Sequence, residues 1–297
     1  MFVEGSMVYD HEKRYDAALF SRILRPEFMP QFDEMAARGT RIFVDCDDAM
    51  FHIPEWSPAH GEFQQFLPTL RHQLEVAERI TVSTEPLREA LGHPDKTDVL
   101  PNLIDLGDWR QYLPDMDDST VRILWAGSRT HGADIERLTE AVDWLREDAS
   151  VHVVFVGMVP KAFSSPLPPN ITFLPGVPLC SYPSLIGLIR PHIALLPLVD
   201  ETFNRCKSAI KWMEMTAAGA ACVCDPVGPY AELAAKNLAL GVKGDEWLTP
   251  IRELINDREH RHQLWNNSIA ELDAKLAWHS PRAEVWHDWY ARQFLPA

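Results

Sequence analysis

Short apolar runs alternate with longer amphipathic stretches along almost the whole chain. Short runs bounded by glycine, proline or aspartate are typical of buried parallel strands, and apolar positions three and four apart are typical of helices. The pattern predicts strands at 16–23, 41–45, 80–83, 98–103, 121–126, 151–156, 171–174, 192–199 and 221–224. It predicts helices at 27–39, 61–78, 85–91, 134–146, 182–189, 203–218, 230–236, 245–256, 259–276 and 281–294.

This alternation favours an α/β fold in which right-handed crossovers join parallel strands. The stretch 105–120 is polar and aperiodic, which predicts a domain boundary there. We therefore expect domains at 1–110 and 111–280, with 281–297 as a closing C-terminal helix. Ligands of such sheets bind at the carboxyl ends of the strands, beside the point where the strand order reverses.

The segment 203–214, which follows the predicted strand 192–199, has an unusual charge pattern. Lys207, Lys211 and Glu214 are four and three residues apart, so they share one face of a continuous helix. Lysines in the first turns of a helix face the positive end of its dipole, and a bound anion would reverse the sign of that interaction. The pattern predicts a phosphate-bearing ligand here, with a solvated Lys–Glu pair as the alternative.

Composition and charge narrow the classes of function. The formal net charge of −15 opposes broad contact with nucleic acid, and 46% hydrophobic residues indicate a globular chain. We expect no membrane-spanning helix and no signal peptide, because no apolar run is long enough and the first residues are not basic. Five cysteines without a C-x-x-C pair predict free thiols and a cytoplasmic protein. No G-x-G-x-x-G turn or P-loop follows a strand, so a dehydrogenase or P-loop enzyme is unsupported.

Several motifs occur together in a recognisable order. They are the sequence G-S-R-T-H at 127–131, F-L-P-G-V at 173–177, the segment 203–214, A-A-G-A at 217–220 and V-G-P-Y at 227–230. This set resembles the donor-binding half of the GT-B-type retaining glycosyltransferases that use nucleotide sugars. The sequence D-C-D-D at 45–48 and the stretches 81–87 and 99–102 resemble parts of their N-terminal half. The resemblance covers about residues 16–294.

The resemblance implies two Rossmann-type parallel-sheet halves that face a cleft, with a minimal N-terminal half and a last helix that packs back on it. It implies transfer of a sugar from a nucleoside diphosphate, UDP in the first instance, to a hydroxyl acceptor with retention of configuration. The acceptor can be a glycan, a small molecule, a protein or, less readily, DNA. No cofactor and no metal are expected.

The resemblance also assigns roles to residues. Lys207 and Arg129 would stabilise the leaving diphosphate, as fixed positive groups do where negative charge develops, and Asp48 would orient the acceptor. Glu214 would accept hydrogen bonds from the ribose, and the backbone of Gly176 and Val177 would read the base. The other expected substrate-binding residues are Gly127, Ser128, Thr130, Ser208, Lys211, Gly228, Pro229, Tyr230, Asp45 and Asp47.

The chain departs from the family pattern at Cys206, which stands where the first of two paired glutamates is expected. Two further hypotheses stay open. The short N-terminal half permits a phage-type enzyme that glycosylates modified DNA bases, and Cys206 permits a non-catalytic module that binds nucleotide sugars. Asp45 and Asp47 also permit a D-x-D metal site, or a plain loop cluster of helix-capping residues.

Overall fold

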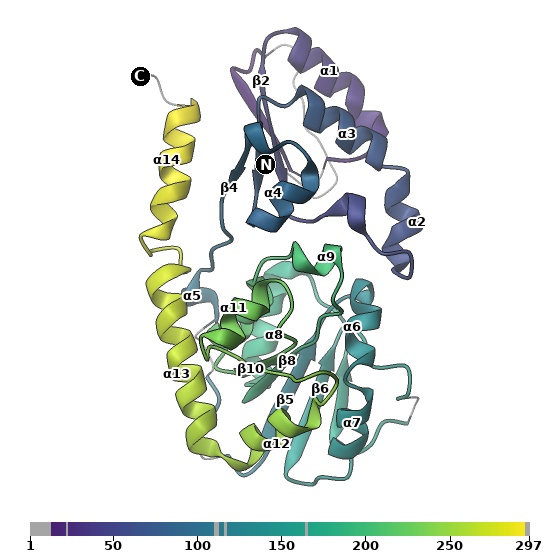
Figure 1. The fold of residues 1–297 in the computed structure, drawn as a ribbon, viewed down its shortest axis with the longest axis vertical. Helices are drawn as coiled ribbons and strands as arrows, with labels where there is room; N and C mark the ends of the chain where they lie inside the picture. The colour runs from purple at the N-terminus through teal and green to yellow at the C-terminus, as the bar shows by residue number, and fades with distance from the viewer. Residues whose placement is uncertain (1–12, 22, 110–112, 116–117, 164–165, 295–297) are drawn as a thin grey trace. The chain divides into compact units, whose positions relative to one another are not determined.

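The computed structural model describes residues 13–21, 23–109, 113–115, 118–163 and 166–294 (Figure 1). The chain divides into two compact units. Unit 1 contains Met1–Pro101, Arg205–Ser208 and Trp286–Ala297, and unit 2 contains Asn102–Asn204 and Ala209–Val285. Each unit has one sheet of parallel strands, which confirms the predicted α/β class. Parts of the stretch 105–120, namely 110–112 and 116–117, lie outside the described residues.

Unit 1 has a four-stranded sheet in the order β1-β2-β3-β4. Its strands are β1 (Ala17–Ser21), β2 (Arg41–Cys46), β3 (Arg79–Val82) and β4 (Thr97–Val99), and its helices are α1 (Met29–Ala37), α2 (Pro58–Gln64), α3 (Leu67–Val76) and α4 (Glu85–Leu91). Side chains alternate between the two faces of the sheet. Phe20 packs on Phe32 of α1, and Phe43 packs on Trp289 of α14 (Arg282–Phe294). The sheet is therefore covered on both faces, with α14 opposite α1 and α3 (Figure 1).

Unit 2 has a six-stranded sheet in the order β10-β9-β8-β5-β6-β7. The chain runs from β5 to β6 and β7 on one side, then returns to β8, so the strand order reverses between β5 and β8. The strands are β5 (Val121–Ala126), β6 (Val151–Val156), β7 (Ile171–Leu174), β8 (Ile193–Leu196), β9 (Ala221–Cys224) and β10 (Leu240–Gly241). Ile123 and Leu124, both fully buried, belong to separate cores on the two faces.

The helices of unit 2 cover both faces of this sheet. They are α5 (Leu106–Trp109), α6 (Gly132–Glu136), α7 (Thr139–Leu145), α8 (Tyr182–Ile189), α9 (Thr202–Arg205), α10 (Ile210–Ala217), α11 (Pro229–Ala235), α12 (Leu248–Asn256) and α13 (Arg258–Lys275). Residues of α8, α10 and α11 pack in one core, and residues of α7 and α12 pack in the other.

Two predicted helices are each two helices in the structure. The predicted helix 61–78 is α2 and α3, because Pro68 is accommodated only in the first turn of a helix that starts at Leu67. The predicted helix 134–146 is α6 and α7, and the break follows a tight turn in which the Arg137 N–H donates to the Asp134 carbonyl. The Arg137 side chain pairs with Asp225, which is 88 residues away in the sequence.

The predicted continuous helix over 203–218 is wrong, because residues 206–209 lie outside α9 and α10. Lys207 therefore does not share a helix face with Lys211 and Glu214. The cause is tertiary. The Cys206 carbonyl accepts a hydrogen bond from Thr84 Oγ1 at 2.7 Å, and Cys206 Sγ donates to the Pro86 carbonyl at 3.5 Å. Contacts with the start of α4 thus override local helix preference.

Unit 2 contains a buried histidine that makes its stability depend on pH. His192 Nδ1 accepts the Arg122 N–H at 3.0 Å, and Nε2 donates to the Asp115 carbonyl at 3.0 Å. Burial lowers the His192 pKa, and the hydrogen bond to the Asp115 carbonyl opposes this in part, while the nearby Arg122 adds to the lowering. In the unfolded chain the His192 ring is protonated at about pH 6.5, whereas in the folded chain it is protonated only at lower pH. The free energy of unfolding therefore falls as the pH drops below about 6.5.

We expect His192 to lower the free energy of unfolding by about 1 kcal/mol when the pH falls from 7 to 5.5. Urea denaturation at the two pH values measures it. His192→Gln should show a smaller difference than the wild type, whereas His279→Gln, at an exposed ring, should show the wild-type difference. Equal pH dependence in all three proteins would contradict the assignment.

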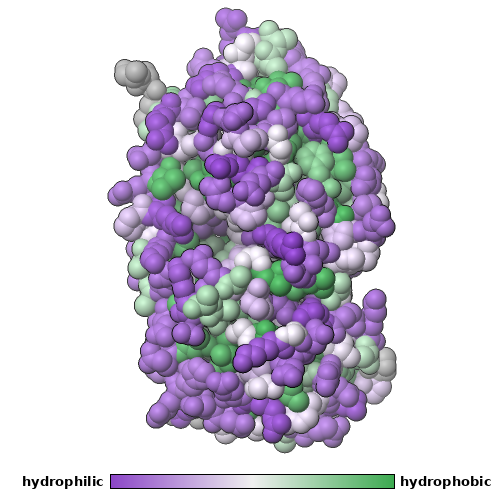
Figure 2. Space-filling model, viewed as in Figure 1, coloured by the Kyte–Doolittle hydropathy of each residue, from purple (hydrophilic) through white to green (hydrophobic). Residues whose placement is uncertain are grey.

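Polar side chains cover most of the face drawn in Figure 2, and apolar ones are scattered among them, as the net charge of −15 leads one to expect. Within the described ranges, no helix combines the length and apolar character needed to cross a bilayer.

Candidate functional site

The loop after β5 lies at the point of unit 2 where the strand order reverses. A Cβ at Gly127 would come within 2.8 Å of the Trp125 ring, so the loop needs glycine at its first position. Ser128 Oγ and Thr130 Oγ1 are 2.7 Å apart, and Arg129 between them is exposed. Two hydroxyls and a guanidinium in one short turn are donors suited to an anion.

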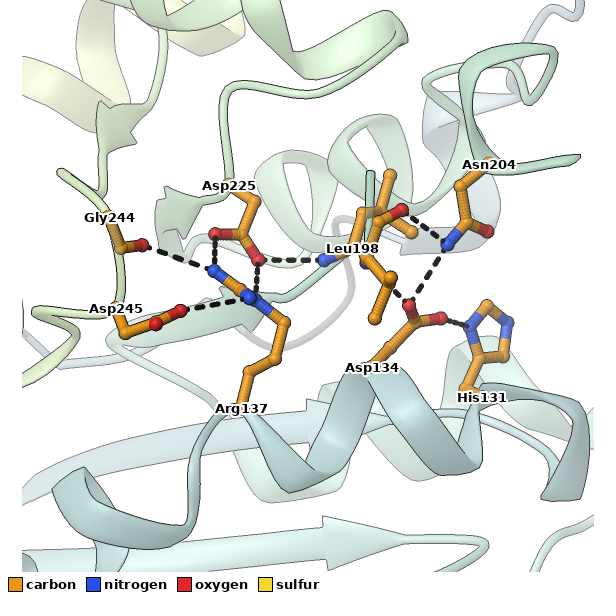
Figure 3. A network of polar contacts seen from close by, with 9 residues as sticks. His131, Asp134, Arg137, Leu198, Asn204, Asp225, Gly244 and Asp245 are labelled. Carbon is orange, nitrogen blue, oxygen red and sulfur yellow. Dashed lines mark hydrogen bonds and ion pairs between the residues drawn. The ribbon is translucent and has the colours of Figure 1, made fainter. Parts of the chain in front are cut away.

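A buried carboxylate, Asp134, joins this loop to the one that follows β8 (Figure 3). Its side chain is 1% exposed. Its Oδ2 accepts from His131 Nδ1 at 2.8 Å, and its Oδ1 accepts from Val199 N at 2.8 Å and Asn204 Nδ2 at 3.0 Å. Asp134 therefore positions both loops at the reversal point.

A second buried carboxylate fixes the end of β9 (Figure 3). Asp225 forms a bidentate ion pair with Arg137, with both N–O distances at 2.8 Å, and Asp225 Oδ2 also accepts the Leu198 N–H at 2.9 Å. Burial raises the Asp225 pKa, and Arg137 opposes that shift. Arg137 also donates to the Gly244 carbonyl at 3.1 Å. Arg137, at the end of α6, thus holds Asp225 after β9, and Asp225 in turn holds Leu198 after β8.

Glu214 and Lys211 lie in the first turns of α10, after β8. Lys211 Nζ donates to Glu214 Oε2 at 2.8 Å and to Tyr182 Oη at 2.9 Å. Their side chains are 28% exposed for Lys211 and 13% for Glu214. Burial lowers the Lys211 pKa, but Tyr182 and Glu214 outweigh it and the net direction is upward. The predicted Lys–Glu pair therefore exists, and its carboxylate faces limited solvent.

The remaining predicted residues of unit 2 occupy turns after strands. Gly176 and Val177 are exposed after β7, and a Cβ at Gly176 would meet nothing within 4 Å. Gly228 precedes α11 with φ +52° and ψ −122°, which glycine adopts most readily, and Pro229 opens the helix. Tyr230 is 5% exposed, and burial raises its pKa. Tyr230 therefore packs in the core of unit 2, and its N–H donates to the Val227 carbonyl at 3.1 Å.

The acidic cluster lies in unit 1 at the end of β2. Asp45 Oδ1 accepts from Thr81 Oγ1 at 2.7 Å, and Oδ2 accepts from Ser21 Oγ at 3.1 Å. Ser21, Asp45 and Thr81 are in register, so Asp45 joins the ends of three strands. Asp47 and Asp48 follow it and are partly exposed. Among the described residues, no group of three His, Cys, Asp or Glu side chains could hold a metal ion.

The segment 205–208 also belongs to unit 1. Lys207 and Ser208 are half-buried, whereas Cys206 is 3% exposed and burial raises its thiol pKa. Cys206 thus packs against α4. Within unit 2 the structure brings the 127–131 loop, Glu214 and the 228–230 turn to one edge of the sheet.

Sequence reasoning missed Asp134, Arg137, Tyr182, Asn204 and Asp225. The one sequence signal among them is the position of Asp225 directly after an apolar strand, at an edge where a parallel sheet brings loops together.

Comparison with known proteins supports the fold. By sequence, no family model and no curated protein matches this chain. By structure, HepE of Anabaena in complex with UDP and glucose is similar, with a TM-score of 0.68 and 14% identity over 93% of this chain and 78% of HepE. The chain has a GT-B-like fold. TarM gives a TM-score of 0.66 at 10% identity, over 93% of this chain but only 55% of TarM. A trehalose-6-phosphate synthase gives 0.59 at 15% identity, over 96% of this chain and 75% of that enzyme.

Proposed function

We propose that this chain is a glycosyltransferase that moves a sugar from a nucleoside diphosphate, UDP in the first instance, to a hydroxyl acceptor with retention of configuration. One observation carries the proposal. The 127–131 loop, with its hydroxyls and Arg129, lies at the same carboxyl edge of a parallel sheet as Glu214, where the strand order reverses. Such edges are where α/β sheets bind their ligands.

The diphosphate is the leaving group, and its negative charge grows as the glycosidic bond breaks. We assign its stabilisation to Arg129 and Lys207, and hydrogen bonds to its oxygens to Ser128 and Thr130. Ser208 follows Lys207, and the next residue, Ala209, is the N-cap of α10. The first N–H groups of that helix point away from its body and favour an anion.

The nucleoside is assigned to the neighbouring turns. Glu214 accepts hydrogen bonds from the ribose, and the backbone of Gly176 and Val177 contacts the base. In the 228–230 turn, Pro229 has no N–H and the Tyr230 N–H is already bonded, so Gly228 is the residue assigned to the donor. HepE, of similar fold, has structures with UDP and glucose and with UDP-glucose, which supports the choice of nucleotide.

The acceptor side is assigned to unit 1. We propose that Asp48 orients the acceptor hydroxyl and that Asp47 assists it, while Asp45 holds the strand ends beneath them. Five free cysteines, four of them buried, fit a reducing cytoplasm.

The Glu214 assignment predicts a defect in donor binding. Glu214→Gln removes a charged acceptor, so we expect the donor KM to rise about 10-fold, as loss of one charge-assisted hydrogen bond allows, with a small change in kcat. The matched control is Glu271→Gln on α13, which also breaks a Glu–Lys pair but lies on a different helix. Equal donor KM and kcat for the two variants would contradict the assignment of the ribose to Glu214.

The proposed function is tested by thermal unfolding in the presence of UDP, GDP, ADP and their sugar conjugates, because a ligand that binds only the folded state raises the melting temperature. A rise with one nucleoside diphosphate, followed by release of that nucleotide from its sugar conjugate, supports the enzyme. Binding without turnover on any hydroxyl acceptor supports a binding module instead. No rise with any of the nucleotides contradicts the proposal.

A further inference from the structure

The phenol of Tyr182 lies beside the carboxylate to which the ribose is assigned. Tyr182 is the first residue of α8, which follows β7, so it lies toward the same carboxyl edge of the sheet as the start of α10. Its Oη and Glu214 Oε2 both bind Lys211 Nζ, at 2.9 and 2.8 Å. The distance between Tyr182 Oη and Glu214 Oε2 therefore cannot exceed the sum of these two hydrogen-bond lengths.

The hydrogen-bonding capacity of Tyr182 is only half used. A tyrosine hydroxyl can donate one hydrogen bond and accept others, whereas a protonated lysine only donates. Burial raises the Tyr182 pKa, so the phenol keeps its proton. Lys211 occupies an acceptor position of Oη, and within the described ranges no acceptor is bound to its O–H.

Glu214 presents the complementary half. Lys211 donates a hydrogen bond to Oε2 of Glu214. In the part of the chain that the structure describes, Oε1 of Glu214 has no hydrogen-bond partner. One nitrogen thus holds in place a hydrogen-bond donor and a charged acceptor, and each has an unused position. Two adjacent hydroxyls of one ligand match this pair, since one can donate to the carboxylate while the other accepts from the phenol.

The Tyr182 ring is held rigidly enough to direct its hydroxyl. It packs edge-on against the buried Trp109, with ring centroids 5.7 Å apart and an interplanar angle of 82°. Lys211 Nζ lies 4.8 Å from the ring centroid, and the ring packs on the core of unit 2. A fixed phenol loses little conformational entropy when it binds a ligand.

We propose that Tyr182 donates a hydrogen bond to one ribose hydroxyl of the donor while Glu214 accepts one from the other, with Lys211 holding both side chains. This inference rests on the proposed function, since it deepens the ribose assignment. It makes the site specific for nucleotides that carry a vicinal diol, whatever their base.

The test compares each nucleoside diphosphate that binds with its 2′,3′-dideoxy analogue, by calorimetry on the full chain. Tyr182→Phe keeps the ring and removes only the hydroxyl. We expect it to weaken the ribonucleotide about 3–10-fold, as loss of one neutral hydrogen bond allows, and to leave the dideoxy analogue unchanged. Tyr290→Phe, at a half-exposed ring of α14, is the matched control and should change neither affinity.

The outcomes separate the inference from the function on which it rests. Equal weakening of both nucleotides in Tyr182→Phe assigns the residue to packing and overturns the inference, as does no weakening of either. A wild-type chain that binds the ribonucleotide and its dideoxy analogue equally also overturns it, without any substitution. A wild-type chain that binds no nucleoside diphosphate overturns the proposed function itself.

Discussion

Lys207→Ala is expected to lower kcat for sugar transfer by about 100-fold or more, as removal of one fixed charge-stabilising donor does in other active sites. The reason is that charge on the diphosphate is greater in the transition state than in the bound donor. The ammonium group therefore contributes more to kcat than to donor affinity. Initial rates of nucleotide release at saturating donor measure the first effect, and calorimetry with the free nucleotide measures the second.

Two further variants make this result specific. Lys207→Arg keeps the positive charge and should retain part of the rate, whereas Lys236→Ala removes a surface lysine that pairs with Glu232 and should change nothing. The melting temperature of each variant shows whether its fold is retained, and the rates are compared only among variants that retain it. Wild-type kcat and nucleotide affinity in Lys207→Ala would place the diphosphate elsewhere.

Nine of the ten strands among the described residues could be predicted from the sequence, because burial on both faces leaves a continuous apolar run. The two-residue strand β10 is too short to leave one. The runs 121–126, 151–156, 171–174 and 221–224 have the same bounds as β5, β6, β7 and β9. Since those bounds place the loops, the turn at 127–131 and the glycine at 228 could also be predicted to follow strands. This much of the candidate site depends on local sequence only.

The breaks in the helices could not be predicted, because their causes are distant in sequence. The Cys206 backbone leaves the helix to bind Thr84, which is 122 residues away. The α6–α7 break accompanies the pairing of Arg137 with Asp225, at a separation of 88 residues. A periodic pattern reports which face of a segment is buried and carries no information on such partners.

The same limit applies to the buried polar residues of the site. Asp134 bonds Val199 and Asn204 across 65 and 70 residues, and Lys211 bonds Tyr182 across 29. In a sequence each reads as an ordinary surface residue of a helix. Their burial follows from the meeting of strand ends at one edge of the sheet, the edge to which the ligand is assigned.

Gly157→Ala is expected to destabilise the chain by about 2–5 kcal/mol, the sum of overpacking and of an unfavourable backbone conformation. Gly157 follows β6 with φ +94°, and a Cβ there would overlap the Gly127 carbonyl oxygen. The two residues are neighbours because β5 and β6 pair in register up to Ala126 and Val156. The substitution therefore displaces the first residue of the 127–131 loop and should also weaken nucleotide binding.

Gly39→Ala separates these two causes. Gly39 follows α1 in unit 1 with φ +83°, but a Cβ there would meet nothing within 4 Å. This substitution should lower the free energy of unfolding only by the cost of the left-handed backbone conformation, about 1–2 kcal/mol. It should leave nucleotide affinity unchanged. Urea denaturation at 25 °C gives both free energies of unfolding. If the two alanine variants lose the same stability, the close approach of Gly157 to Gly127 does not constrain the loop. A larger loss in Gly157→Ala, accompanied by weaker nucleotide binding, ties the shape of the candidate phosphate loop to the packing of the strand beside it.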